Sequence, residues 1–409
     1  MTIANQKFNL TDQTELFKIN YYKKSENMYN SDNVLEGTIK KRYDFTGKSR
    51  FVATPLSFSG GVGSGTLPKA NAGTYGDALI TSKRVYARAQ VERESIKASA
   101  NDAGAFVKAT QETVKKCVES YMRNCSRILF GDGTGALGTG DNSTNLTGDG
   151  SVGTPFVVVI SDATWKEANF EERDYVNYAS ETTLLEIVEV DVAAKSISLV
   201  GTSAGLTALI GSAVPGIFYM QGSKDNDPTG LKSLTDVAIA GTGSLYNLPF
   251  QRRWSMTINN ASSAGITTDR MNGVMLDIER KFGKVPNVIV TSFAQFQNVL
   301  ALMEDHKRYP VDPRSKDLKG KLSFQGVEFM STRGPVALFA DRFCEDDRMY
   351  FLNNNFIERH HRPDFGWFDD DGTVFLRTAE SDDYEARYGG YFENYITPSA
   401  HGCIYGLAV

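Results

Sequence analysis

The stretch YEARYGGYFENYITPSAHGCIYGL, Tyr384 to Leu407, ends two residues before the last residue of a 409-residue chain. It contains five tyrosines, four glycines and one phenylalanine within 24 residues, and no Asp, Glu, Lys or Arg follows Glu393. Aromatic residues favour β-strands, and terminal segments are usually disordered unless the fold holds them. We therefore expect this stretch to form strands inside a sheet.

The composition is that of an ordinary folded domain, with 41% hydrophobic and 23% charged residues. The longest apolar runs have five residues, as in Phe156 to Ile160, and are too short to span a bilayer. The N-terminal 24 residues lack the apolar segment of a secretory signal. The four cysteines show no C-x-x-C spacing, which disfavours a zinc site or a disulfide framework. We expect a protein that folds in a cytoplasm, without membrane, metal or cofactor.

The net charge of -5 conceals an uneven distribution. Residues 1–130 hold 20 Lys and Arg against 12 Asp and Glu, whereas residues 131–409 hold 24 against 37. Opposite charges on two parts of one chain favour association between copies. A pair of independently solvated surfaces explains the same distribution equally well.

A long amphipathic helix is predicted over Ala98 to Phe130, capped by Ser99 or Asn101 and ended by Gly131. Apolar or small residues recur every three or four positions at Phe106, Thr110, Val114, Cys117, Tyr121, Cys125 and Ile128. Such a helix spans about 45 Å, which is long for a globular domain. Before it, RFVATPLS (50–57) and the alternating DALITSKRVYARAQVER (77–93) predict a long hairpin that needs support from elsewhere.

The rest of the chain is mixed. Residues 131–155 are glycine-rich and indicate a connector, and residues 155–222 predict a small antiparallel barrel or sandwich with a turn at Ala193 to Lys195. Two amphipathic helices are expected, one over 267–283 and one capped by Ser292, with Phe293, Phe296, Leu300 and Met303 on the apolar face of the second. After Val327 the pattern is mostly that of strands.

None of the local motifs predicts an active site. Gly133-Thr-Gly-Ala-Leu-Gly138 matches G-x-G-x-x-G but follows a helix, so a linker explains it better than a phosphate site. The run of three aspartates before Gly372 predicts an Asp-Gly hairpin turn. His360 and His361 are adjacent and would point to opposite faces of a strand, so the RHHR cluster favours an exposed interface patch. Two distant carboxylates of a carbohydrate-active enzyme need no local motif and remain an alternative.

An arm, a hairpin and a long helix that cannot be stable alone favour a subunit of an assembly. In order along nearly the whole chain, these parts resemble the major capsid proteins of tailed bacteriophages. The residues that carry the resemblance are the closing stretch, FGDGTGALG after the long helix, and the helix pair TTDRMNGVMLDIERKFGKVPNVIVTS with FAQFQNVLALM.

The resemblance implies an α+β fold with an arm, an extended loop, a spine helix, and peripheral and axial domains. On this chain the parts map to an N-terminal arm (1–49), an extended hairpin loop (50–96), a spine helix (97–131), a Gly-rich linker (132–154), an inserted antiparallel β domain (155–222), and an axial domain with returning peripheral strands (223–409).

For function, the resemblance implies a non-enzymatic shell protein of the virion, assembled in the host cytoplasm. Hexamers and pentamers would enclose double-stranded DNA without sequence preference, with portal, scaffolding and decoration proteins as further partners. Arg84 and Arg88 on the hairpin are predicted to contact acidic groups of residues 131–409 in a neighbouring subunit. The alternatives are an encapsulin-type nanocompartment shell, which shares the fold, and a monomeric β-rich carbohydrate-binding or hydrolytic protein.

Overall fold

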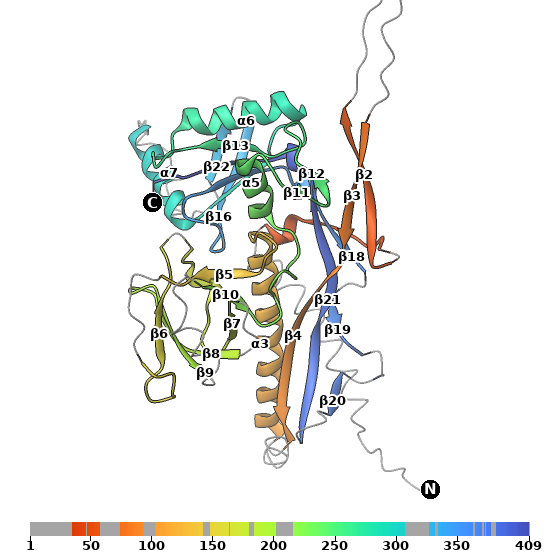
Figure 1. Ribbon diagram of the computed structural model, residues 1–409, viewed down its shortest axis with the longest axis vertical. Helices are drawn as coiled ribbons and strands as arrows, with labels where there is room; N and C mark the ends of the chain where they lie inside the picture. Colours follow the sequence, from red (N-terminus) through yellow and green to blue (C-terminus); the bar gives the residue numbers. More distant parts are fainter. Residues whose placement is uncertain are drawn as a thin grey trace, which may run out of the picture. The chain divides into compact units, whose positions relative to one another are not determined.

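The computed structural model describes residues 35–45, 47–57, 74–93, 103–141, 148–162, 164–179, 184–201, 216–306, 327–331, 334–362, 365–369, 372, 374–377 and 382–408, without the side chains of 57, 74, 103–112, 303–306, 327–328 and 330. The chain forms two compact units. Figure 1 labels their helices and strands. Unit 1 comprises residues 1–50, 81–129 and 358–394, and unit 2 comprises 51–80, 130–357 and 395–409. The predicted arm residues 1–34, hairpin tip 58–73 and helix caps 99–101 lie outside the described residues.

A six-stranded sheet forms the framework of unit 1. Its strands are β1 (Lys40–Arg42), β4 (Lys83–Glu92), β18 (Ile357–His361), β19 (Gly366–Trp367), β20 (Phe375–Arg377) and β21 (Asp383–Ile396). The central strand, β21, comes from the closing stretch of the sequence, and β4 pairs with it antiparallel over ten residues. The prediction that 77–93 pairs with 50–57 is therefore wrong for β4, because its partner lies about 300 residues away along the chain.

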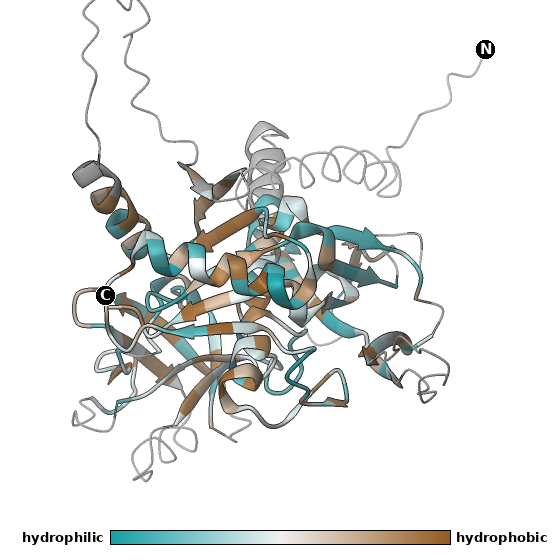
Figure 2. Ribbon diagram, turned by 90° about the horizontal axis from the view of Figure 1, so that it is seen from above, coloured by the Kyte–Doolittle hydropathy of each residue, from teal (hydrophilic) through white to brown (hydrophobic). Residues whose placement is uncertain are grey.

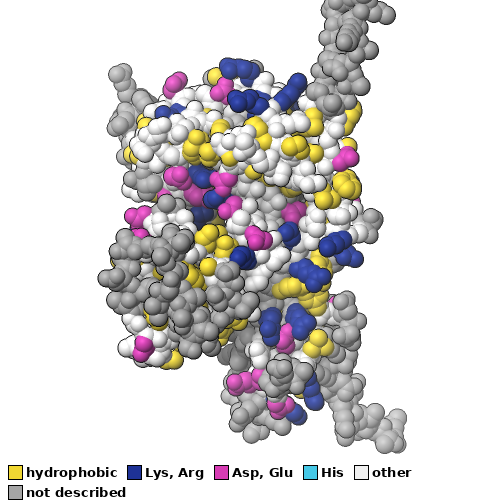
Figure 3. Space-filling view, viewed as in Figure 1, with side chains coloured by type: hydrophobic (Ala, Val, Ile, Leu, Met, Phe, Trp, Pro, Cys, Tyr) yellow, Lys and Arg dark blue, Asp and Glu magenta, His cyan; other side chains and the backbone are white. Residues whose placement is uncertain are grey.

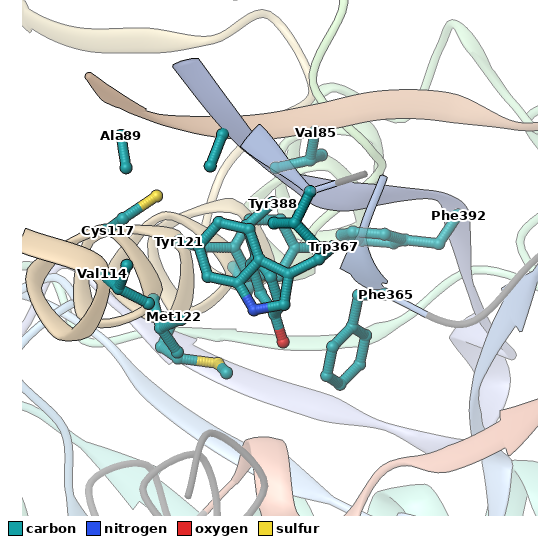
Figure 4. Packing of buried hydrophobic residues seen from close by; sticks show 14 of the residues in the cluster. Val85, Ala89, Val114, Cys117, Tyr121, Met122, Phe365, Trp367, Tyr388 and Phe392 are labelled. Atoms are coloured by element: carbon teal, nitrogen blue, oxygen red, sulfur yellow. The ribbon is translucent and has the colours of Figure 1, made fainter. Parts of the chain in front are cut away.

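The long helix is α3 (Ala103–Leu129), and it covers one face of this sheet. Its described apolar positions are buried as the periodicity predicts: Val114, Cys117, Val118, Tyr121, Met122, Cys125, Ile128 and Leu129. They pack on Val85 and Ala89 of β4 and on a group of aromatic rings, with Tyr121 and Tyr388 edge to face at 5.0 Å (Figure 4). The helix is thus stabilised by packing on one apolar side, which is the usual source of helical stability in proteins.

Residues 35–45 are held in unit 1 by the cluster that the sequence predicted as an exposed patch. β1 pairs in parallel with β18, and Arg359, His360 and His361 are all buried. Arg359 donates from both terminal nitrogens to the two carboxylate oxygens of Glu36 at 2.7 Å, and from Nε to Asn394 at 2.8 Å. The exposed-patch prediction is wrong, because a nonlocal acid neutralises the arginine and makes its burial possible.

The Asp-Gly turn does not form a hairpin. Gly372 donates its N–H to the Asp369 carbonyl at 2.8 Å and has a positive φ of 79°, as a turn requires. However, β19 and β20 on either side both pair antiparallel with β21, at consecutive positions along it. β19 and β20 therefore run in the same direction beside β21, and the turn between them does not reverse the chain.

Unit 2 contains a closed six-stranded barrel. Its strands are β5 (Ala136–Thr139), β6 (Phe156–Val159), β7 (Tyr175–Tyr178), β8 (Leu184–Asp191), β9 (Ser196–Gly201) and β10 (Ile217–Met220), in the order β5-β10-β7-β8-β9-β6. A bridge between Gly140 and Ile160 joins the last strand to the first. Buried side chains such as Phe156, Leu185 and Phe218 fill the interior. The predicted turn is present between β8 and β9, where Asp191 accepts from two backbone N–H groups.

The barrel begins earlier than the sequence predicts. β5 lies in the stretch that we expected to be a glycine-rich linker, and its carbonyl and amide groups bond to β10 and to the segment after β6. Gly135, with φ of 81°, is required because a Cβ there would lie 2.4 Å from the Ser223 carbonyl oxygen. Lys166 links the barrel to the rest of unit 2, with its Nζ 3.0 Å from Glu345. Deletion of residues 154–222 would therefore remove β10 and the segment after β6, which pair with β5, and would leave the backbone groups of β5 unpaired.

The second sheet of unit 2 has six strands in the order β13-β22-β17-β14-β16-β15. These are β13 (Thr257–Asn260), β14 (Val288–Thr291), β15 (Val327–Ser331), β16 (Gly334–Ala340), β17 (Met349–Leu352) and β22 (Gly402–Tyr405). The strands beneath the helices are largely hydrophobic (Figure 2), and β14 and β17 are buried throughout. β22 also comes from the closing stretch and lies inside the sheet, so the expectation raised by that stretch is confirmed.

Helix α6 (Thr268–Phe282) lies within the range 267–283 that the sequence predicts for it. Thr267 caps its start by accepting from the Arg270 N–H, and Gly283 ends it with a φ of 79°. Its face of Met271, Val274, Met275 and Ile278 is buried. A Cβ on Gly402 of β22 would lie 2.6 Å from Ile278, so the glycine allows helix and sheet to approach each other.

Two features of the remaining helices differ from expectation. Helix α7 (Phe293–His306) is capped by Ser292 as predicted, but Phe293 is 63% exposed, whereas Gln295 and Val299 are buried. Gln295 can face inward because its amide donates to the carbonyls of Asp346 and Ala408, at 2.9 and 2.7 Å. Helix α5 (Leu231–Ala240) was not predicted.

The hairpin that does form joins β2 (Ser49–Ser57) and β3 (Thr74–Thr81). The short paired strands β11 (Ser244–Leu245) and β12 (Leu248–Pro249) lie beside it, since a Cβ on Gly76 would lie 2.8 Å from Leu248. The Leu79 N–H donates to the Tyr246 carbonyl at 2.9 Å. The hairpin is therefore anchored through β3 to the rest of unit 2.

Candidate assembly surface

The outward face of β4 and β21 carries both of the residues predicted to act between subunits. Strand alternation turns Val85 and Ala89 inward onto α3, so Arg84, Tyr86, Arg88, Gln90 and Glu92 point outward. In the register of the two strands, Arg84 lies opposite Tyr391, Tyr86 opposite Gly389, and Arg88 opposite Arg387. We call this the β4–β21 face.

Three aromatic rings form the centre of the β4–β21 face. Tyr86 lies 5.7 Å from Phe368 and 6.2 Å from Tyr391, and Phe368 lies 6.3 Å from Tyr391. Tyr86 is 42% exposed, and burial together with its hydrogen bond to Tyr391 raises its pKa to about 12. Gly389 makes room for this ring, since a Cβ there would lie 3.0 Å from it and 2.4 Å from the Val85 carbonyl oxygen.

Arginines flank the rings, and two of these arginines share one carboxylate. Like charges directly across a sheet repel, but Arg88 and Arg387 both bond to Glu385, with Arg88 at 2.6 Å. Burial acts to raise the pKa of Glu385, yet the hydrogen bonds from Arg387 and Arg88 outweigh it and lower the pKa. Arg84 instead lies over the Tyr391 ring at 6.0 Å.

The other end of this face is acidic. Gln90 donates to Asp383 at 2.7 Å, and Arg93 pairs with Asp382 at 2.9 Å. The face therefore changes from basic and aromatic to acidic along the strands. Exposed Tyr and Arg side chains around a few aromatic rings are typical of residues that dominate protein–protein binding.

The structure thus places Arg84 and Arg88 on one surface, with Arg88 engaged inside its own chain. Their role between subunits stays a prediction. The sequence reasoning missed Phe368, Arg387 and Tyr391, which reach the face from other strands. The signal available in the sequence was the Arg-Tyr-Gly-Gly motif, in which Gly389 provides the space for Tyr86.

In unit 2, the outer side of the β2–β3 hairpin is a second exposed apolar surface. Phe51 and Tyr75 are each 64% exposed, although Thr54, Gly76, Ala78 and Ile80 of the same two strands are buried. Large exposed aromatic residues on a projecting pair of strands favour contact with another protein surface.

The described residues hold no group of three or more His, Cys, Asp or Glu side chains arranged for a metal ion. None of the described helices is long and apolar enough to cross a membrane. The four cysteines, all buried, are free.

Comparison with solved structures identifies the fold. A chain of the cyanophage A-1(L) capsid asymmetric unit aligns with 100% of this chain and 96% of its own length, with a TM-score of 0.54 at 12% identity. The capsid of a native GTA particle covers 91% of this chain and 90% of its own, with a TM-score of 0.45 at 8% identity. An encapsulin complex from Synechococcus elongatus PCC 7942 covers 91% and 87%, with a TM-score of 0.44 at 6% identity.

No family model matches the sequence. No curated protein is detectably similar to it either. At these identities the structural likeness concerns the fold alone. The chain therefore has the fold of phage capsid proteins, as the resemblance of its closing stretch and helices implied.

Proposed function

We propose that this protein is the major capsid protein of a tailed bacteriophage. Copies would form hexamers and pentamers that close into an icosahedral head around double-stranded DNA, with no enzymatic activity. The observation that supports this most strongly is the extent of the structural likeness, which covers the whole chain and almost all of a cyanophage capsid chain.

In this proposal the exposed surfaces act between subunits. The outer side of the β2–β3 hairpin, with Phe51 and Tyr75, would lie across a neighbouring copy. The basic end of the β4–β21 face, with Arg84 and Arg88, would meet acidic groups from residues 131–409 of a neighbour. Each exposed ion pair contributes only about 0–1 kcal/mol, so repetition around a closed shell has to supply the effect.

The boundaries of the arm, loop, helix, linker, inserted and axial segments are part of the same proposal. In this proposal the inserted domain would begin at β5 and span about residues 136–220, because β5 belongs to the barrel. Portal, scaffolding and decoration proteins remain proposed partners in the virion.

The test is negative-stain microscopy and sedimentation of the purified protein. We expect closed shells, formed alone or with a scaffolding or portal protein supplied. A monomer under every such condition would contradict the proposal and favour the β-rich carbohydrate-binding alternative. Shells that enclose a protein cargo and exclude DNA would favour the encapsulin-type alternative.

A further inference from the structure

The C-terminal end of α6 and the turn before β13 together present a group of cations. Figure 3 shows Lys and Arg side chains gathered over α6 at the top of that view. We call the following residues the basic cluster: Arg252, Arg253, Arg280, Lys281 and Lys284. Arg252, Arg253, Arg280 and Lys284 are exposed, and Lys281 is half-buried.

Lys281 joins the two segments, and it has no acidic partner among the residues that the structure describes. Its Nζ donates to the backbone carbonyl and, at 3.1 Å, to the hydroxyl of Ser255, both of which are neutral acceptors. The Ser255 hydroxyl in turn donates to the Arg252 carbonyl at 2.9 Å, which fixes the turn. Burial and the nearby Arg252 charge lower the pKa of Lys281 to about 8. An ammonium group in this position lacks the counter-charge that buried cations usually have.

The other cations of the cluster are nearly as poorly compensated. Within the described part of the turn and the last two turns of α6, the acidic residues are Asp277 and Glu279, and Asp277 pairs with Arg280 at 2.9 Å. Cations in the last turn of a helix are favoured by about 0.3–1 kcal/mol through the helix dipole, which accounts for Arg280 and Lys281. It does not account for Arg252 and Arg253, which precede α6 by more than ten residues.

We propose that the basic cluster binds the phosphate backbone of double-stranded DNA inside the shell. This inference rests on the proposed function. Phosphate oxygens would supply the missing acceptors for Arg252, Arg253 and Lys281, and binding through charge alone is independent of sequence. The turn and the end of α6 offer no stacking platform for single-stranded bases, since Trp254 is buried and the half-buried Phe282 packs edge to face with Phe356.

The same lack of exposed aromatic residues argues against a protein partner at this surface. Protein interfaces concentrate their binding energy in buried aromatic and Arg anchors with an apolar core. Leu276, at 41% exposed, is the one large apolar side chain that α6 presents to solvent in the described structure. Several unpaired cations with so little apolar area fit a polyanion better.

The test measures binding of the purified chain to a random-sequence DNA duplex by fluorescence anisotropy over a range of salt concentrations. The variant is Arg252→Gln with Arg253→Gln, because both side chains are exposed and the fold does not depend on them. We expect about tenfold weaker binding at low salt and a salt dependence reduced by about two phosphate contacts. Lys115→Gln with Lys116→Gln, two exposed cations of α3, is the matched control and should bind DNA as the unmodified chain does.

Equal losses in the two variants would overturn the inference, because they would show a general effect of net charge. Unchanged DNA binding combined with failed shell assembly in the Arg252/Arg253 variant would also overturn it, in favour of an acidic protein partner. If the unmodified chain forms no shell, the proposed function fails, yet selective loss of DNA binding in the variant would still support the basic cluster. Lys281→Met, checked for folding by circular dichroism, should weaken binding in the same direction.

Discussion

The β4–β21 face and the basic cluster are both rich in arginine and lysine, but they differ in how the charges are paired. On the β4–β21 face, Arg88 and Arg387 share Glu385, Arg93 has Asp382, and Arg84 lies over an aromatic ring. In the basic cluster, among the described residues, Arg280 alone has a carboxylate within ion-pair distance. The two surfaces therefore present similar cationic side chains, but most of these are paired on the β4–β21 face and most are unpaired in the basic cluster.

This difference indicates which kind of partner each surface suits. Cations that are already paired keep fixed directions and little free charge, which favours a shaped, mixed-charge protein surface. Cations without partners gain most from an anion that supplies many negative charges at once, as the DNA backbone does. Pairing is thus a better guide to the partner than the number of basic residues.

The largest effect is expected where pairing is combined with full burial, at Glu36 and Arg359. Glu36→Gln leaves a buried guanidinium without its carboxylate and should lower the free energy of unfolding by about 3–5 kcal/mol, measured by urea denaturation. Glu358→Gln, which removes the partner of exposed Arg42, is the control and should cost about 0–1 kcal/mol. If both variants lower the free energy of unfolding by similar amounts, burial does not determine how much an ion pair stabilises this protein.

Glu385→Ala should leave Arg88 and Arg387 of the β4–β21 face without a carboxylate partner. Arg88 and Arg387 would lose their shared acceptor and repel each other across the strands, at a cost of about 1–2 kcal/mol in unfolding free energy. The variant should also gain salt-sensitive DNA binding in the anisotropy assay. Asp162→Ala, which frees the exposed Lys195 on the barrel, is the control. No gain in DNA binding would mean that free arginines alone do not create a polyanion surface.

Substitution of Lys281 should change the free energy of unfolding by a smaller amount, and this change should depend on pH. Its pKa is about 8 in the folded chain against 10.5 ordinarily, so the unfolded chain binds more protons between these values. Stability therefore rises as pH increases through this window and falls as pH decreases toward 8. Lys281→Met should remove this dependence and stabilise the chain near neutral pH by about 1 kcal/mol, since partial exposure weakens the burial penalty.

The measurement for Lys281 is denaturation at pH values below and above the window. Lys284→Met, an exposed neighbour, should leave the pH dependence unchanged. A Lys281→Met variant that keeps the full pH dependence would show that another group causes it.

The smallest effect on the folded chain is expected for Arg84→Glu with Arg88→Glu. Both arginines are exposed, Arg84 has no ion pair among the described residues, and Arg387 remains bonded to Glu385. The subunit should therefore stay folded while shell assembly is impaired at low salt. Sedimentation at two salt concentrations measures this. Normal assembly of the variant would show that the basic end of the β4–β21 face does not act between subunits by charge.

Elements defined by local patterns were predictable from the sequence. The buried positions of α3 and α6, the cap at Ser292 and the stop at Gly283 follow from helical periodicity and from backbone groups that need partners nearby. The closing stretch was predicted to form strands because its aromatic residues suit a pleated surface. The resemblance of these elements also led to the capsid fold, which the structural comparison supports.

Tertiary structure alone decided the features that depend on distant partners. β4 pairs with β21 instead of β2, and β5 closes the barrel instead of forming a linker, because a strand's partner is chosen by long-range packing and register. Arg359 of the RHHR cluster is buried because Glu36, more than 300 residues earlier, neutralises it. Gln295 faces inward, in place of Phe293, because carbonyls from two other segments accept its amide hydrogens. Sequence periodicity reports which side of an element is apolar, whereas a buried charge or amide is permitted only by the partner that the fold brings to it.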